Sequence, residues 1–158
     1  MRRLLYILIC IFVSNHLCAQ VSSFKIKEEF FVEPTMEGIS YLFTHVDSVD
    51  WNNVMLPLGF KSIPASKKVT ALEYKKEVEG VSEYIGFDDR YWVLTFIWKD
   101  ASGKNLISKN LKKVLKKKEY NQSGTYKINF NGLDFIIAME SNKEKAIYEM
   151  ITIENERK

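Results

Sequence analysis

Cysteine and histidine are scarce in this chain of 158 residues, which has two of each. Both cysteines, Cys10 and Cys18, lie in the N-terminal segment together with His16. If that segment is removed, no thiol remains and His45 becomes the one histidine. Cysteine nucleophiles, disulfides and zinc sites made of cysteine or several histidines are therefore excluded from the remaining chain.

The motifs of several enzyme classes are also absent. The sequence has no Walker loop, no dinucleotide-binding glycine fingerprint and no G-x-S-x-G nucleophile motif. His45 lies in ISYLFTHVDSV, a segment with helical spacing, and we interpret it as a structural or surface residue rather than a catalytic base. We therefore predict no catalytic residue, no cofactor and no metal site.

Pairs of carboxylates remain, because a glycosidase-like mechanism needs only two acids at a suitable separation. The candidate pairs are Asp88 with Asp89, Glu28 with Glu29, and Asp47 with Asp50. Asp88 and Asp89 stand between two strand-like runs, which is typical of a hairpin turn. Asp50 precedes the short helical pattern WNNVML and is predicted to be its N-cap. A carboxylate-based hydrolase is therefore the least favoured alternative.

The N-terminus has the layout of a secretory signal peptide. Arg2 and Arg3 precede the apolar run LLYILICIFV, and the more polar SNHLCAQ follows it. The run has ten residues, half of the roughly 20 that a transmembrane helix needs. We predict cleavage of residues 1–19 after Ala19, so that the mature chain, residues 20–158, is periplasmic or secreted and has no transmembrane segment.

Cys18 offers an alternative, because a lipoprotein signal ends at a cysteine that becomes the lipidated N-terminus. That processing favours a small residue before the cysteine, whereas Leu17 stands there. Lipid anchoring at Cys18 is therefore the minor alternative to an unanchored mature chain.

Apolar periods of two and of 3.6 residues follow one another along the rest of the chain. Two alternating runs flank Asn131-Gly132, a dipeptide that favours the two-residue turns of β-hairpins. The expected strands are 24–32, 69–78, 81–87, 90–98, 125–130, 133–139 and 146–154, and the expected helices are 35–46, 50–56 and 104–118. We predict one α+β domain with a polar C-terminal tail, in which an antiparallel sheet of about five to six strands packs against two or three helices.

The run RYWVLTFIW, residues 90–98, is apolar on both faces of the strand that it predicts. The face expected to pack against the main helices carries Trp92, Leu94, Phe96 and Trp98. The opposite face carries Tyr91, Val93, Thr95 and Ile97. Because three short helices cannot cover both faces of the sheet, we predict that some of Tyr91, Val93 and Ile97 form an exposed apolar patch for a protein partner or a ligand.

The segment 104–118 holds seven lysines and no acidic residue. On a helical wheel one arc carries Ile107, Leu111, Val114 and Leu115, and the opposite arc carries Lys109, Lys112, Lys113 and Lys116. Without Arg2 and Arg3 the chain has 21 basic and 20 acidic residues, so the part outside this segment has 14 basic against 20 acidic. Such segregation produces a local positive field. We interpret the lysine arc as a solvated helix face, with a docking surface for an acidic partner or an anionic surface as the alternative.

The partner is not expected to be nucleic acid, because the lysine arc has no aromatic residue on which bases could stack. We predict an exported, non-enzymatic binding protein of the bacterial envelope that docks another protein, for example as an inhibitor or immunity protein. The alternative is a small-molecule or lipid carrier with an apolar pocket against the aromatic sheet.

Overall fold

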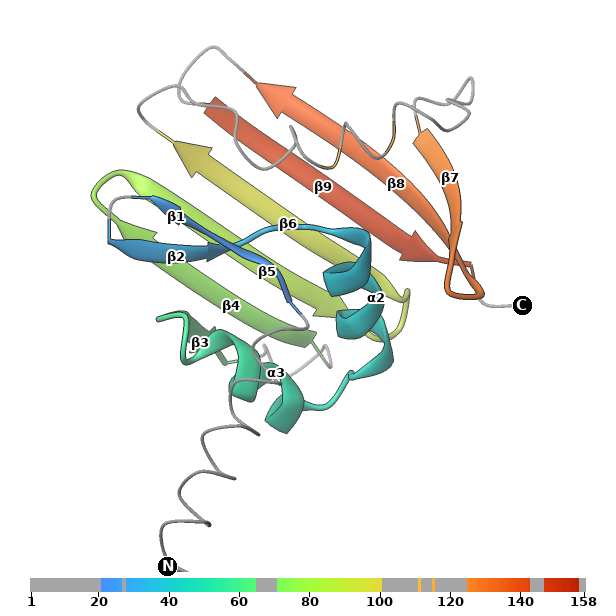
Figure 1. Cartoon of the computed structure of the whole chain (residues 1–158), viewed down its shortest axis with the longest axis horizontal. Helices are drawn as coiled ribbons and strands as arrows, with labels where there is room; N and C mark the ends of the chain where they lie inside the picture. The colour runs from blue at the N-terminus through green and yellow to red at the C-terminus, as the bar shows by residue number, and fades with distance from the viewer. Residues whose placement is uncertain are drawn as a thin grey trace, which may run out of the picture.

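The computed structural model describes residues 21–26, 28–64, 71–100, 111, 115, 125–142 and 147–156 (Figure 1). A seven-stranded antiparallel sheet runs through it in the order β3-β4-β5-β6-β9-β8-β7, and β1 and β2 form a separate hairpin. The strands are β1 Ser23–Ile26, β2 Glu29–Val32, β3 Lys61–Ile63, β4 Ala71–Val78, β5 Val81–Asp88, β6 Val93–Asp100, β7 Thr125–Phe130, β8 Leu133–Asn142 and β9 Ile147–Asn155; the helices are α2 Met36–Thr44 and α3 Ser48–Met55. The α+β class and the antiparallel sheet are as predicted.

The sheet is larger than the five to six strands that were expected, because β3 joins its edge. β3 has three residues, too few to show alternation in the sequence, and it pairs with β4 directly after Gly59, whose φ is +83°. The run expected as one strand over 24–32 is instead the β1–β2 hairpin. Glu28 lies in a turn directly before β2, where a continuous strand was predicted.

The two helices begin at side-chain caps. Thr35 Oγ1 accepts the N–H of Gly38 at 3.2 Å at the start of α2. Asp47 Oδ1 accepts the N–H of Val49 at 2.6 Å at the start of α3. The prediction of Asp50 as the N-cap was wrong: Asp47 already has the extended backbone of a cap, and Asp50 lies in the first turn, where its charge favours the helix dipole.

The predicted apolar stripe of α2 is buried at Ile39, Leu42 and Phe43. Val46, expected at the end of the same stripe, lies beyond the last turn and is 39% exposed. Helical spacing therefore holds only up to Thr44, where the helix ends.

The central strand β6 begins at Val93, three residues later than predicted. The chain turns at Asp89–Trp92 instead, and Trp92 adopts a φ of +52°. Leu94, Phe96 and Trp98 are buried, as predicted from the alternation. Trp92 is half-buried and reaches the core from the turn, with its ring 5.6 Å from that of Phe87 in an edge-to-face arrangement.

The β7–β8 hairpin forms at the predicted place, with its turn at Asn131 (φ +51°) and Gly132 (φ +80°). Positive φ at both positions is the requirement of a type I′ turn, which Asn-Gly meets at low cost. β8 continues to Asn142, beyond the predicted end of this strand at residue 139, so Ser141 and Asn142 pair with β9. β9 then lies between β6 and β8 and joins the two halves of the sheet.

One face of the sheet carries the core. The helices α2 and α3 and the β1–β2 hairpin all lie on that face (Figure 1). Phe31 of the hairpin packs edge-to-face on Trp98 at 5.1 Å, Phe43 of α2 on Phe87 at 5.7 Å, and Trp51 of α3 lies 5.9 Å from Tyr74. No helix among the described residues is long and apolar enough to span a bilayer.

Candidate functional site

The face of the sheet opposite α2, α3 and the β1–β2 hairpin is called the open face here. Residues paired across neighbouring strands lie side by side on this face. Tyr84 pairs with Ile97, Thr95 pairs with Thr152, and Thr152 pairs with Ala138. Its half-buried side chains are Tyr84, Val93, Thr95, Ile97, Thr152, Ile136 and Ala138. The sequence-predicted pair Val93 and Ile97 lies on this face.

Tyr91, the third residue predicted for the patch, is not brought together with Val93 and Ile97. It lies in the turn before β6, where it is 68% exposed, and the Arg90 guanidinium stands 5.5 Å from its ring. The sequence analysis predicted that some of these three residues form a patch; Val93 and Ile97 share the open face, whereas Tyr91 precedes β6 in the turn.

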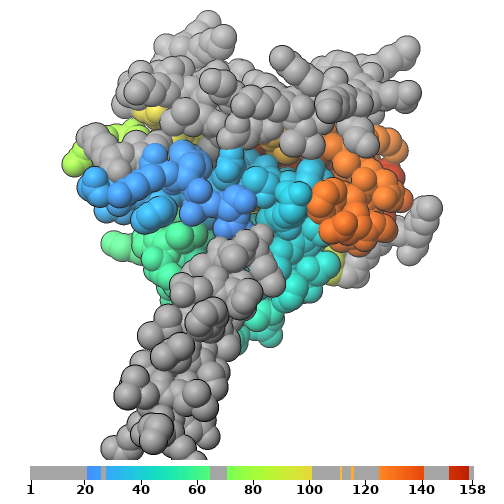
Figure 2. All heavy atoms as spheres, in the orientation of Figure 1, coloured from blue at the N-terminus to red at the C-terminus, as the bar shows by residue number. Residues whose placement is uncertain are grey.

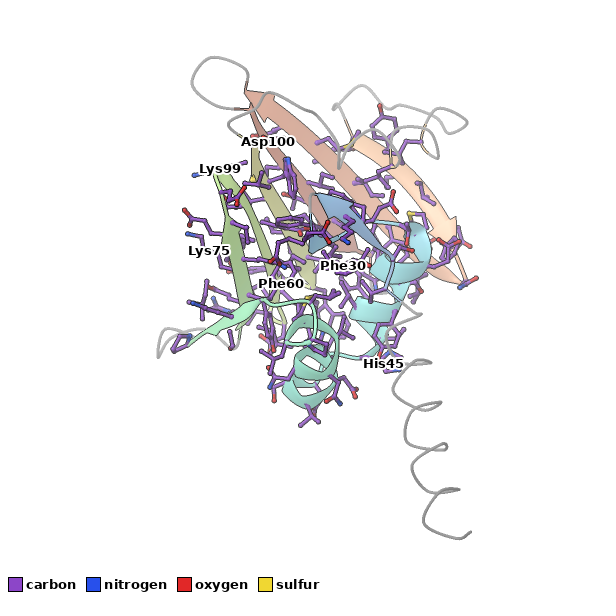
Figure 3. The ribbon with its side chains drawn as sticks, turned by 60° about the vertical axis from the view of Figure 1, so that its left-hand side comes forward. Phe30, His45, Phe60, Lys75, Lys99 and Asp100 are labelled. Carbon is purple, nitrogen blue, oxygen red and sulfur yellow. The ribbon has the colours of Figure 1, made fainter. Side chains whose placement is uncertain are left out.

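Charged residues border the open face. Lys75 and Lys99 project from the side of the sheet away from Phe60, which lies among the buried side chains (Figure 3). Lys75 Nζ donates to Glu77 Oε2 at 2.8 Å, and the hydrogen bond to Lys75 holds the pKa of Glu77 below its ordinary value. The open face thus has an apolar and threonine-rich centre with ion pairs at its border.

Tyr84 flattens part of the open face by lying over Gly86. A Cβ at Gly86 would stand 2.5 Å from the Tyr84 hydroxyl oxygen, so only glycine leaves room for the ring. Burial, followed by the charge of Glu73 and a hydrogen bond to it, raises the pKa of Tyr84 to about 12. The phenol therefore stays protonated at neutral pH.

The four lysines predicted as a second binding surface, Lys109, Lys112, Lys113 and Lys116, lie outside the described residues. Two residues of the same segment, Leu111 and Leu115, are described as helical and buried in the core. Both belong to the apolar arc of the predicted helix. The position of the lysine arc stays a prediction.

A buried pair of charged residues, Lys76 and Glu83, was not anticipated from the sequence. They face each other across β4 and β5 on the core side of the sheet. Lys76 Nζ donates to Glu29 Oε2 at 2.7 Å and to the carbonyls of Phe30 at 3.0 Å and Leu58 at 2.7 Å. The three donors of the ammonium group are therefore all used, and two of them hold the β1–β2 hairpin on the sheet.

Glu83 is a second anchor of that hairpin, since its Oε2 accepts the N–H of Val32 at 2.9 Å. Burial raises the pKa of Glu83 well above its ordinary value, against the smaller opposing effects of the Val32 hydrogen bond and the charge of Lys76. Its Oε1 and the Nε1 of its cross-strand neighbour Trp98 have no hydrogen-bond partner in the described part of the chain. Strand alternation, which places both Lys76 and Glu83 on the apolar face, was the signal that could have found them.

His45 lies on the surface at the end of α2 (Figure 3). Its ring stacks on Tyr41 at 4.0 Å, and its Nδ1 stands 3.0 Å from both the Tyr41 carbonyl and Thr44 Oγ1. A surface position agrees with the interpretation made from the sequence.

Several of the carboxylates weighed for catalysis have structural contacts, whereas Asp89 Oδ1 is buried without a hydrogen-bond partner in the described part of the chain. Asp88 Oδ1 accepts the N–H of Arg90 at 2.9 Å in the turn, as predicted for that position. Glu29 pairs with Lys76, and Glu28 Oε2 accepts from Lys25 Nζ at 2.6 Å. No group of three His, Cys, Asp or Glu residues in the described ranges could hold a metal ion.

A cleft of about 740 Å³ opens at one end of the sheet. The end of α2, the β5–β6 turn, the β7–β8 hairpin and the end of β9 surround it. Its lining residues are Phe43, Thr44, Trp92, Asn129, Gly132, Leu133, Asp134, Asn155 and Glu156. The two acids are bonded to neighbours: Asn129 Nδ2 donates to Asp134 Oδ1 at 2.7 Å, and Lys127 Nζ donates to Glu156 Oε1 at 2.9 Å.

Comparison of the chain with protein-family models, with curated proteins and with solved structures found no match.

Proposed function

We propose that this protein is an exported, non-enzymatic binding protein of the bacterial envelope that docks a protein partner through the open face of its sheet. An inhibitor or immunity protein, which neutralises another exported protein by covering it, is one concrete form. The proposal concerns the mature chain, residues 20–158, after removal of the predicted signal peptide.

The observation that carries the proposal is the composition of the open face. Val93 and Ile97 stand there on β6 and Ile136 on β8, with β9 between these two strands, and the described helices lie on the other side of the sheet (Figure 3). Burying such apolar area stabilises a complex by roughly 25 cal/mol per Å² before the costs of association are subtracted. An apolar centre with a charged border is the usual anatomy of a protein interface.

Two further observations favour docking over the other functions. Three of the carboxylates that an enzyme could use have structural partners: Asp47 caps α3, Asp88 accepts a hydrogen bond in the turn, and Glu29 pairs with Lys76. The aromatic side chains on the core side of the sheet pack against Phe31, Phe43 and Trp51 from the elements above them, where a carrier would need a cavity. Protein docking through the open face requires no rearrangement of these packed aromatic side chains.

The experiment compares two surface substitutions of matched chemistry. Ile97→Lys places a charge in the centre of the open face, whereas Val49→Lys places one on α3, where Val49 is 62% exposed. Partners captured by the mature protein from its own envelope extract are identified by mass, and the affinity of each variant for the purified partner is then measured. We expect Ile97→Lys to abolish binding and Val49→Lys to leave it unchanged, with both variants folded in a thermal melt.

Retained affinity in a folded Ile97→Lys variant would exclude the open face as the docking surface. A captured partner that is chemically altered by the wild-type protein would exclude a non-enzymatic function.

A further inference from the structure

The cleft at the end of the sheet has the properties of a small-molecule site. Four elements distant in the sequence form it: α2, the β5–β6 turn, the β7–β8 hairpin and the end of β9. Figure 2 shows α2 beside the β7–β8 hairpin on the surface of the molecule. Its volume, about 740 Å³, falls in the ordinary range of small-molecule sites.

Aromatic rings fixed by the core supply the apolar part of the lining. The centre of the Phe43 ring lies 5.7 Å from that of Phe87 and 5.3 Å from that of Phe135, so two buried rings hold it in position. Trp92 packs edge-to-face on Phe87, and its carbonyl accepts the N–H of Asn155 at 3.2 Å. An apolar ligand would therefore meet rings that are already ordered, which lowers the entropic cost of binding.

The polar part of the lining is negative. Asp134 and Glu156 carry its charges, and none of the described lining residues is Lys, Arg or His. The C-terminal end of α2 adds partial negative charge through Phe43 and Thr44, and the last turn of this helix contains no basic residue.

Lys127 lies outside the lining of the cleft and forms an ion pair with Glu156, one of the two acids of the lining. The side chains of this ion pair are 61% and 44% exposed, and ion pairs of that exposure contribute little to stability. A ligand cation can therefore replace Lys127 as the partner of Glu156 at small cost.

We propose that this cleft binds a small organic cation with an aromatic or other flat apolar body, of the chemical class of arylalkyl amines. The ammonium group lies between the carboxylates of Asp134 and Glu156, and the apolar body contacts Phe43, Trp92 and Leu133. The face of an indole attracts a cation in addition to its apolar contacts.

The test uses three probes that share a phenyl group and differ in charge: phenethylamine, 2-phenylethanol and 3-phenylpropionate. Each is titrated into the mature protein, and amide chemical shifts are followed by two-dimensional NMR. We expect saturable shifts with phenethylamine, concentrated at Thr44, Gly132 and Asn155, weaker binding of the alcohol and no binding of the carboxylate. The amine affinity should also fall as salt screens the carboxylates.

A variant with both Asp134→Asn and Glu156→Gln retains the shape of the cleft and removes its charge. We expect its affinity for phenethylamine to fall by about tenfold or more, since hydrogen bonds to charged groups are the stronger ones, and its affinity for the alcohol to be unchanged. Glu37→Gln, in the first turn of α2, removes an exposed acid at the other end of that helix and serves as the control.

Three results would each overturn the proposal: equal binding of the amine and the carboxylate, amine shifts located elsewhere on the protein, or no saturation by the amine. The last measurement is made on the wild-type protein, so it decides the question even if the double variant does not fold.

Discussion

At the scale of single residues, the least expected feature is a carboxyl group buried under the β1–β2 hairpin. Glu83 holds the hairpin through the N–H of Val32, and Lys76 holds it through Glu29 and the Phe30 carbonyl. A buried charge is costly unless it is paired, so a raised pKa and a neutral carboxyl are the expected response. Here the direction of the pKa shift makes the stability of the fold depend on pH.

Glu83→Gln should remove that dependence. The pKa of Glu83 in the folded protein lies above the ordinary value of 4.5. Between these two pKa values the folded protein keeps the Glu83 proton and the unfolded chain does not, so unfolding releases a proton. The contribution of Glu83 to the free energy of unfolding is therefore largest below pH 4.5 and decreases toward the raised pKa, by at most about 1.4 kcal/mol per pH unit. Urea unfolding of the wild type and the variant between pH 4 and 8 measures the difference.

The variant should be at least as stable as the wild type at pH 8, where glutamine avoids ionisation of a buried acid. Glu140→Gln, at an exposed position of β8, is the control and should retain the wild-type pH dependence. If the free energy of unfolding depends on pH equally in the wild type and in Glu83→Gln, the raised pKa of the buried Glu83 carboxyl is contradicted.

A second prediction at this scale concerns Phe96, in the middle of β6. It is buried between the β5 and β9 neighbours Ile85 and Ile151. Phe96→Ala should cost about 3–5 kcal/mol of unfolding free energy, because it leaves a cavity in a packed core. Tyr91→Ala, at the exposed turn, should cost little. Chemical denaturation of both variants checks this, and a similar small loss in each would contradict the assigned facing of β6.

At the scale of elements, local signals decide which parts of the fold could be predicted. The dipeptide Asn131-Gly132 strongly favours a type I′ turn, so the β7–β8 hairpin was predicted at the correct place. β3 forms by pairing with the edge strand β4, and its three residues are too few to show a strand pattern in the sequence. The turn predicted at Asp88 and Asp89 extends to Trp92, and this extension was missed because a tryptophan at positive φ contradicts the preference of bulky residues. The edge-to-face contact of Trp92 with Phe87 helps to compensate for it.

The predicted lysine helix gives a test of a complete element. We expect the combined change of Lys109, Lys112, Lys113 and Lys116 to Gln to leave the thermal melt almost unchanged, since these residues lie opposite the arc that contains the buried Leu111 and Leu115. If the arc contributes to docking, affinity for the captured partner falls, and the wild-type interaction weakens with added salt.

Leu111→Ala is the contrasting variant, because it alters the buried arc of the same segment and should destabilise the fold by about 2–5 kcal/mol. Unchanged affinity together with an unchanged melt of the quadruple variant would leave the lysine arc as a solvated helix face. A large loss of stability in that variant would contradict the helical wheel itself.

At the scale of the whole molecule, the sites depend on contacts that no local pattern records. Alternation placed Val93 and Ile97 on the open face, and the sequence could predict that much of the candidate site. The cleft could not be predicted from the sequence, because the order of the strands in the sheet brings its lining residues together. These include Thr44, Trp92, Gly132 and Glu156. Sequence reasoning therefore reached the residues of one element and failed where several elements converge.

Export is a prediction about the whole chain. We expect the mature protein to start at Gln20 and to contain no free thiol, because both cysteines precede that residue. Intact mass and thiol titration of the protein recovered from the envelope measure both points. Cys18→Ser should change neither the start nor the yield, whereas loss of processing in that variant, or a lipid mass on Cys18, would establish the lipoprotein alternative.

The strand order also determines when the fold can be completed during protein synthesis. β9, the last described strand, pairs with β6 on one side and β8 on the other. A ribosome-bound chain that still lacks Ile147–Asn155 can form the β3–β6 meander and the β7–β8 hairpin, but none of the other described strands pairs with both pieces. Until that strand emerges, both pieces present unpaired strand edges, which favour aggregation.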